Sequence, residues 1–296
     1  MLVYTRRFVL FCLLRAFFIF VTLNTPGVWA ATTEAAPSPA PIRFLLSFDD
    51  GPSAADSNNP TAKILDTLAH NKVQSGIKAL FFVQTRSRNG GATEVGQGLL
   101  RREFAEGHLL AFHTATPRHS NHRFLTEQEL EHSLQTGAAD LTAITGKAPT
   151  LVRPPFWNYD ERTLAAYQQH ELRPLLTDLS ANDGKTIGVN FSLTKRRNML
   201  KMLTQFRQRW LTGATRVVDG ITPVVVTFHD INTYTASHTE EYLSILIDVA
   251  RELDMPIAGK AFYDEKDELE RAALASTIQD GDVKPRLPGL WNWLWQ

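Results

Sequence analysis

Residues 43–52 read RFLLSFDDGP, and this stretch decides the fold class that the sequence predicts. The residues before the two carboxylates are mostly apolar and have the length and composition of a buried strand. Gly51 and Pro52 end the strand, because proline fixes φ and lacks an N–H, whereas glycine permits unusual backbone angles. Asp49 and Asp50 therefore stand at the carboxyl end of a strand. In α/β folds this is where ligands and substrates bind.

Segments of strand and helix type alternate along the rest of the chain. We expect further strands at 79–83, 109–112, 150–153, 174–177, 224–228 and 256–258, and helices at 61–73, 99–106, 126–145, 160–170, 193–211 and 240–253. This alternation predicts one α/β domain over 42–265 with a largely parallel sheet.

The composition is that of a globular protein and gives no sign of a nucleic-acid ligand. The chain has 296 residues, of which 43% are hydrophobic and 21% are charged, and its formal net charge is zero. A domain that binds nucleic acid typically carries a basic excess. We therefore expect no nucleic-acid partner.

Residues 1–30 have the pattern of a signal peptide. Arg6 and Arg7 precede two apolar runs, and VWA at 28–30 fits a small-x-small cleavage site. Arg15 interrupts the apolar stretch, which argues against a stable membrane span. The sole cysteine also lies in this segment. We expect a periplasmic or secreted protein, and an uncleaved N-terminal membrane anchor is the alternative.

Two further segments flank the predicted domain. Residues 31–41, ATTEAAPSPAP, have the composition of a spacer. Residues 266–296 form a C-terminal tail that contains Trp291, Trp293 and Trp295. These tryptophans either cover an apolar surface of the domain or form a patch that contacts sugars or a membrane interface.

Four of the predicted strands end in side chains that can carry out chemistry. These side chains are Asp49 and Asp50, His113, Arg153, and His229 with Asp230. A metal hydrolase needs imidazoles and a carboxylate as ligands and leaves positions for water and substrate. Asp50 and His113 would suffice together with one more histidine from HTATPRHSNH, at 113–122, which offers His119 and His122.

The ordered motifs FDDGP, HTATPRH, RPPF, DLSAND and TFHD resemble those of the NodB-type polysaccharide deacetylases, carbohydrate esterase family 4, over about 42–260. The resemblance implies an irregular (β/α) barrel with largely parallel strands and a divalent metal, commonly zinc. It also implies removal of N-acetyl groups from the N-acetylhexosamine residues of a glycan. With export, the substrate would be a cell-envelope or extracellular glycan, such as peptidoglycan, a chitin-like oligomer or an exopolysaccharide.

The resemblance also assigns roles to the strand-end residues. Asp49 resembles the general base, and Arg153 the arginine that pairs with this base. His229 resembles the general acid that protonates the leaving amine. Pro155 and Phe156 are expected to contact substrate, and the backbone N–H of Phe156 matches the position that helps to hold the oxyanion.

The second motif departs from the family pattern His-Ser/Thr-x-x-His. Pro117 occupies the place of the second histidine, and His119 follows His113 by six positions instead of four. However, His119 keeps the family's distance from the predicted helix cap. We therefore infer a two-residue insertion and expect Asp50, His113 and His119 as metal ligands, with His122 as the alternative to His119.

The fourth motif departs from the family pattern as well, because the usual Asp-Trp pair is here Asp183-Gly184. The aromatic wall that this tryptophan forms is therefore missing or supplied from elsewhere. Asp183 is expected to orient His229, and Asp178 is the second candidate.

The altered motifs leave two other interpretations open. One is an enzyme that acts on another C–N bond, such as a deformylase of a lipid-linked sugar or an amidase. The other is a glycan-binding module with a degenerate site. A measurement of bound zinc separates these two interpretations, because a binding module need not hold stoichiometric zinc.

Overall fold

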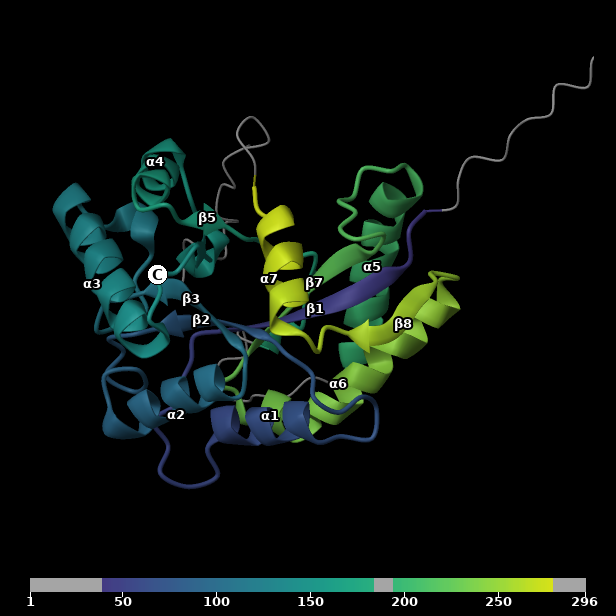
Figure 1. Cartoon of the computed structure of the whole chain (residues 1–296), viewed down its shortest axis with the longest axis horizontal. Helices are drawn as coiled ribbons and strands as arrows, with labels where there is room; N and C mark the ends of the chain where they lie inside the picture. Colours follow the sequence, from purple (N-terminus) through teal and green to yellow (C-terminus); the bar gives the residue numbers. More distant parts are fainter. Residues whose placement is uncertain (1–38, 184–193, 279–296) are drawn as a thin grey trace, which may run out of the picture. The chain divides into compact units, whose positions relative to one another are not determined.

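The computed structural model describes residues 39–183 and 194–278, and a parallel β-sheet forms its centre (Figure 1). The strands are β1 (Ile42–Asp49), β2 (Leu80–Gln84), β3 (Leu109–Thr114), β4 (Leu151–Val152), β5 (Arg173–Pro174), β6 (Leu179–Ser180), β7 (Thr222–His229) and β8 (Ile257–Phe262). The α-helices are α1 (Pro60–Ala69), α2 (Glu94–Ala105), α3 (Glu127–Thr145), α4 (Glu161–Gln169), α5 (Lys195–Leu211), α6 (Thr233–Glu252) and α7 (Lys266–Ala275). Short 3-10 turns span His122–Phe124 and Pro155–Trp157.

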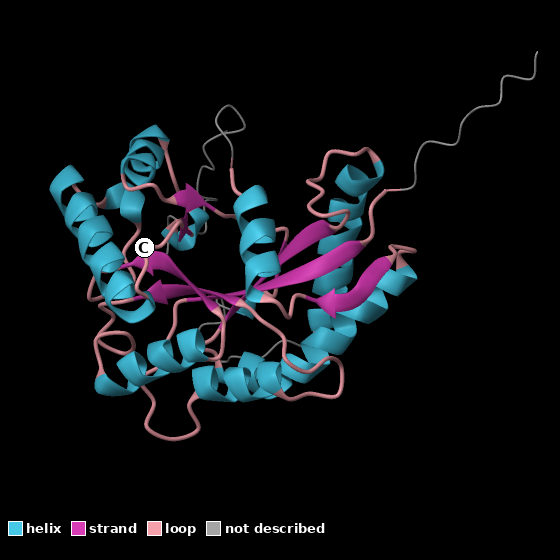
Figure 2. Ribbon diagram, in the orientation of Figure 1, coloured by secondary structure: helices cyan, strands magenta, loops and turns pink. Residues whose placement is uncertain are grey.

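The strand order is β5-β4-β3-β2-β1-β7-β6, and β8 pairs with the first half of β1. Every pairing between these strands is parallel. Helices α1, α2 and α6 lie along one side of the sheet and α7 on the other (Figure 2). The predicted fold class, an irregular (β/α) barrel with parallel strands, is therefore confirmed.

Strand β1 serves both the core and the strand-end edge of the sheet. Phe44 and Leu46 point to the main apolar cluster, which the outer helices cover. Leu45 lies on the opposite face and packs in a second cluster. Because side chains alternate along a strand, Ser47 and Asp49 share the face of Leu45. This face therefore changes from apolar to polar toward the carboxyl end of the strand.

Helix α7 occupies the start of the segment 266–296, which the sequence prediction assigned to a tail. Its Leu269, Ala272 and Ala273 are buried and pack in the same cluster as Leu45 of β1. Helix α7 therefore closes the apolar end of the inner sheet face, and the packed domain continues beyond 265.

Helices α2 and α6 begin earlier than the sequence pattern predicts. Helix α2 starts at Glu94 instead of 99, and two glycines in its first turns hide the helical pattern. Helix α6 starts seven residues before the predicted 240, because the Asn232 side chain accepts hydrogen bonds from two backbone N–H groups of the first turn. Both corrections concern polar turns that only tertiary structure identifies as helical.

Three of the sequence predictions fall outside the described residues. These are the signal peptide at 1–30, nearly all of the spacer at 31–41, and the cluster of Trp291, Trp293 and Trp295. Within the described ranges, none of the helices combines the length and hydropathy needed to cross a bilayer.

Candidate active site

Side chains from four strands meet at the carboxyl edge of the sheet. Asp49 ends β1 and Asp50 directly follows it, His113 comes from β3, and His229 comes from β7, where it stands opposite Asp49 in the register. Arg153 directly follows β4. The structure thus brings together the strand-end residues that the sequence singled out.

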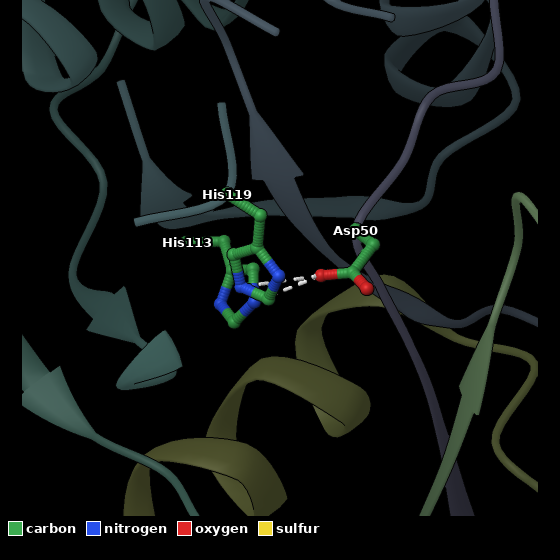
Figure 3. A group of neighbouring side chains, drawn as sticks. All are labelled: Asp50, His113 and His119. Carbon is green, nitrogen blue, oxygen red and sulfur yellow. Dashed lines mark ion pairs between the residues drawn. The ribbon is translucent and has the colours of Figure 1, made fainter. Parts of the chain in front are cut away.

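Asp50, His113 and His119 form a group that fits a divalent metal (Figure 3). Asp50 Oδ1 lies 3.1 Å from His113 Nε2 and 3.5 Å from His119 Nε2. Tetrahedral ligands bound to zinc at about 2.0–2.1 Å lie about 3.3 Å from one another. His119 Nε2 is also buried without a hydrogen-bond partner among the described residues. Spacing, donor types and this free nitrogen all match a metal site with three protein ligands.

The protonation states of Asp50 and His119 suit metal binding, which requires an ionised carboxylate and neutral imidazoles. Burial opposes the charge of Asp50, but the imidazoles of His119, His113 and His229 outweigh it and hold the pKa of Asp50 well below its usual value. Burial lowers the pKa of His119 to about 4. At neutral pH the carboxylate is therefore charged and His119 carries a free lone pair.

The turn after β1 separates the two adjacent carboxylates. Asp50 has a φ of 74°, in the left-handed region that few non-glycine residues adopt. Gln84 Nε2 donates a hydrogen bond of 3.1 Å to Asp50 Oδ1. A Cβ at Gly51 would lie 1.9 Å from Asp230 Oδ2, so only glycine fits there. This turn aims Asp50 at the histidines, whereas Asp49 keeps its place in the strand.

Asp49 forms a buried ion pair with Arg153, whose side chain is 0% exposed. Arg153 Nη1 donates hydrogen bonds of 2.7 Å to Asp49 Oδ1 and 2.8 Å to Ser47 Oγ. Its Nε donates to the carbonyl of Leu175 at 3.0 Å, and the guanidinium lies 4.0 Å from the centre of the Phe82 ring. The arginine is therefore fixed on every side, and it fixes the carboxylate.

His229 is held by Asp183. Its Nδ1 donates to Asp183 Oδ1 at 2.7 Å, and its backbone N–H donates to Oδ2 at 3.0 Å. Burial alone would lower the pKa of His229, but the carboxylate of Asp183 raises it to about 10. His229 Nε2 lies 3.9 Å from Asp50 Oδ2. A protonated imidazole therefore faces the candidate metal ligands.

The first turn of α6 holds Asp183 in place. The Thr235 hydroxyl donates to Asp183 Oδ2 at 2.6 Å, and the Asn232 side-chain amide donates to the Asp183 carbonyl at 2.7 Å. Sequence reasoning missed both residues, as it missed Ser47 and Gln84. For Ser47 a signal existed, because it lies two residues before Asp49 and thus on the same strand face.

The two second-choice residues from the sequence lie away from this site. His122 is fully buried, with its Nδ1 2.9 Å from the Tyr167 hydroxyl and its ring stacked on Phe112. Asp178 pairs with Arg209 at 2.7 Å and accepts a hydrogen bond from a backbone N–H of β7. Neither side chain contacts the carboxylate–histidine group.

The two residues expected to contact substrate differ in exposure. Pro155 is buried, whereas the Phe156 ring is 40% exposed. Phe156 stacks on His119 with ring centroids 4.4 Å apart and an angle of 13° between the planes. The segment after β4 therefore forms one wall beside the candidate ligands.

The loop that carries His119 is anchored at both ends. At its start, the backbone N–H of Ala115 donates to Ser133 Oγ of α3 at 3.0 Å. At its end, Thr126 and Glu129 form a capping box at the first turn of α3. His119 therefore lies in the part of the loop between the two anchors.

Comparison with known proteins agrees with this fold. Residues 38–175 match the family model described as polysaccharide deacetylase. The chain is 32% identical over 156 residues to a chitin deacetylase of Pestalotiopsis sp, covering 51% of this chain and 48% of that protein. It is 34% identical over 117 residues to the peptidoglycan-N-acetylglucosamine deacetylase PgdA of Listeria monocytogenes, covering 38% of this chain and 21% of that protein.

A solved structure shows the same fold. The chitin deacetylase of Colletotrichum lindemuthianum superposes with a TM-score of 0.57 at 20% identity, covering 77% of this chain and 90% of that one. The resemblance in the motifs to the polysaccharide deacetylases is therefore confirmed, and the family model covers residues 38–175. The chain spans about half or less of the length of these curated relatives.

Proposed function

We propose that this protein removes N-acetyl groups from the N-acetylhexosamine residues of a glycan by metal-dependent hydrolysis. One observation carries the proposal: the group of Asp50, His113 and His119 stands beside a buried carboxylate, Asp49, and an imidazole, His229, which are register partners on neighbouring strands. Amide hydrolysis needs one group that accepts a proton and one group that donates a proton.

The metal site supplies the polarising charge. Asp50, His113 and His119 would hold the divalent ion, with zinc as our choice because one carboxylate and two imidazoles suit it. When bound, such an ion polarises the amide carbonyl and makes water a stronger acid. An ion held by three protein ligands leaves room for water and substrate.

The residues of the chain then move the protons. Asp49, fixed by Arg153, accepts the proton of the attacking water. The backbone N–H of Phe156 donates a hydrogen bond to the oxyanion. His229, kept protonated by Asp183, donates a proton to the amine nitrogen as acetate leaves. The general base and the general acid are thus separate groups with separate supports.

Substrate class and location are part of the same proposal. Similar proteins are named chitin deacetylase and peptidoglycan-N-acetylglucosamine deacetylase, so an N-acetylglucosamine polymer is the first expectation. The predicted signal peptide at 1–30 supports an envelope or extracellular glycan. The interpretations as an amidase of another kind or a glycan-binding module have no particular contact in the described residues that favours them.

The test is acetate release from N-acetylglucosamine oligomers and from peptidoglycan. The protein is stripped of metal, refilled with zinc, and assayed beside His119→Ala and His122→Asn. We expect zinc-dependent acetate release from the wild type. His119→Ala should abolish this release and His122→Asn should largely keep it, because His119 contacts Asp50 whereas His122 contacts Tyr167. Thermal unfolding of both variants shows whether each one is folded.

Two results would contradict the proposal. If the zinc-loaded protein released no acetate from any glycan, the deacetylase activity would be wrong. If it bound glycan but retained no zinc after dialysis, the binding-module interpretation would replace it.

A further inference from the structure

The two candidate imidazole ligands are held in different ways. The ring of His113 is 2% exposed, and its Nδ1–H donates to the carbonyl of Arg153 at 2.7 Å. The ring of His119 is 26% exposed and makes no hydrogen bond with any residue in the described ranges. Figure 3 shows both rings side by side, reaching toward Asp50. Among the described residues, His119 therefore has no partner for its second nitrogen, whose hydrogen bond usually supports a metal-binding histidine.

An aromatic ring takes the place of that hydrogen bond. Phe156 stacks on His119 almost in parallel, with the centroids 4.4 Å apart and the planes at 13°. This ring is one of the few large apolar side chains that are exposed in the described part of the chain. Its face-to-face contact with the imidazole restricts the tilt of His119 and thereby the direction of Nε2.

The backbone of this segment is bent to place the ring there. Phe156 has φ 60° and ψ 12°, and Trp157 follows with φ 54°, both in the left-handed region. Non-glycine residues rarely adopt this region, and such residues cluster at functional sites. Two prolines precede them, and the Trp157 N–H donates to the Pro154 carbonyl at 2.9 Å, which closes the turn.

We infer that Phe156 is a positioning residue of the metal site, whose ring holds the His119 imidazole so that Nε2 points at Asp50. The inference rests on the proposed function, because it needs the metal group described above. One short segment then orients both histidines: the carbonyl of Arg153 fixes His113, and the ring of Phe156 fixes His119. This arrangement compensates for the loop insertion that carries His119.

A role in sugar contact alone is the competing explanation for an exposed aromatic ring. Stacking of Phe156 on a glycan would change the KM for that glycan and leave the zinc affinity unchanged. Positioning of His119 changes the zinc affinity in the absence of any substrate. Metal titration therefore separates the two explanations without an activity assay.

The experiment is zinc competition against a chromophoric chelator, with wild type, Phe156→Leu, Phe156→Tyr and Phe124→Leu. Phe124 is the matched control, because it is 57% exposed on the same loop as His119 and stacks on no aromatic ring in the described ranges. We expect Phe156→Leu to weaken zinc binding about tenfold, as loss of a supporting contact to a metal ligand does. Phe156→Tyr and Phe124→Leu should stay within about twofold of wild type, because they keep the stacked ring.

A second readout uses cobalt in place of zinc. The visible absorption of bound Co²⁺ reports the ligand geometry, so Phe156→Leu should change the spectrum and Phe156→Tyr should restore it. If Phe156→Leu fails to fold, Phe156→Met provides the same loss of the flat ring with a flexible side chain.

The outcomes distinguish this inference from the proposed function. If wild type binds zinc and Phe156→Leu binds it equally well with an unchanged cobalt spectrum, the positioning role is wrong and the proposed metal site stands. If wild type itself binds no zinc, the proposed metal site is wrong and the positioning role falls with it.

Discussion

Two buried carboxyl groups at the same sheet edge have opposite surroundings. Asp49 is paired with the Arg153 guanidinium at 2.7 Å. Asp230, which follows His229, accepts a hydrogen bond from Thr61 Oγ1 at 2.8 Å, but its Oδ1 has no partner among the described residues. The first carboxyl forms an ion pair with a buried guanidinium, whereas the side-chain hydrogen bond of the second comes from a neutral hydroxyl.

A further carboxyl enlarges this contrast. Glu103 of α2 is buried, and neither of its carboxyl oxygens has a hydrogen-bond partner in the described ranges. Burial raises the pKa of Asp230 to about 7, and burial together with Asp230 raises the pKa of Glu103 well above its usual value. The difference teaches that burial alone does not make a carboxyl basic or acidic. A buried partner of opposite charge decides which group works as a carboxylate and which stays protonated.

The largest expected effect comes from replacing Asp49, the carboxyl group that pairs with Arg153. Asp49→Asn should lower acetate release by about 10²- to 10⁴-fold, the usual contribution of a general base. Zinc binding should be retained, because Asp50 and not Asp49 contacts the histidines. Steady-state kinetics with zinc titration measures both. Asp230→Asn, which replaces a carboxyl of raised pKa by a neutral amide, should lose much less, and equal losses in the two variants would remove the contrast.

The next effect concerns stability. Arg153→Met leaves Asp49 buried without its cation, so the free energy of unfolding should fall by about 3–5 kcal/mol. Urea denaturation measures the change. The double variant Asp49→Asn with Arg153→Met removes both charges and should recover part of the loss. A double variant less stable than Arg153→Met alone would show that shape and not charge dominates.

The raised pKa of Asp230 predicts how the free energy of unfolding changes with pH. The pKa of Asp230 is higher in the folded protein than in the unfolded chain, so the folded state holds more protons between about pH 4 and pH 7. The free energy of unfolding should therefore fall as pH rises through this range, by up to about 1.4 kcal/mol per pH unit for one proton.

Glu103→Gln tests this pH effect directly. The variant removes one of the two carboxyl groups, so its unfolding free energy should fall less steeply with pH and exceed that of wild type at pH 8. Denaturation at a series of pH values measures both slopes. Parallel slopes for the two proteins would mean that Glu103 and Asp230 do not interact.

The smallest expected effects come from removing one hydrogen bond to Arg153 or one hydrogen bond to Asp230. Ser47→Ala removes one acceptor of Arg153 and should cost about 1 kcal/mol of stability, since Asp49 and a backbone carbonyl remain. Thr61→Val, of similar shape, removes the hydroxyl donor of Asp230 and should cost more. Equal losses by urea denaturation would show that the two carboxyl groups are equally well supported.

The sequence predicted the strand-end residues well because apolar runs followed by turn residues are local signals. It could not predict the contacts of Thr235 or Ser47, which depend on elements far apart in the chain. Helix α7 was missed because much of its buried face is alanine, which gives a weak apolar pattern. The position of His119 was predicted by counting residues from the cap of α3, because the count from His113 does not fit the family pattern. The structure places His119 beside Asp50.

The anchored loop between β3 and α3 has a practical consequence for protein engineering. Because its two ends are fixed by Ser133 and by the capping box at Thr126, we expect residues added at the exposed positions 117 and 118 to leave both ends in place. Grafted sequences can therefore enter this loop just before Arg118, provided that the span from His119 to Thr126 keeps its length.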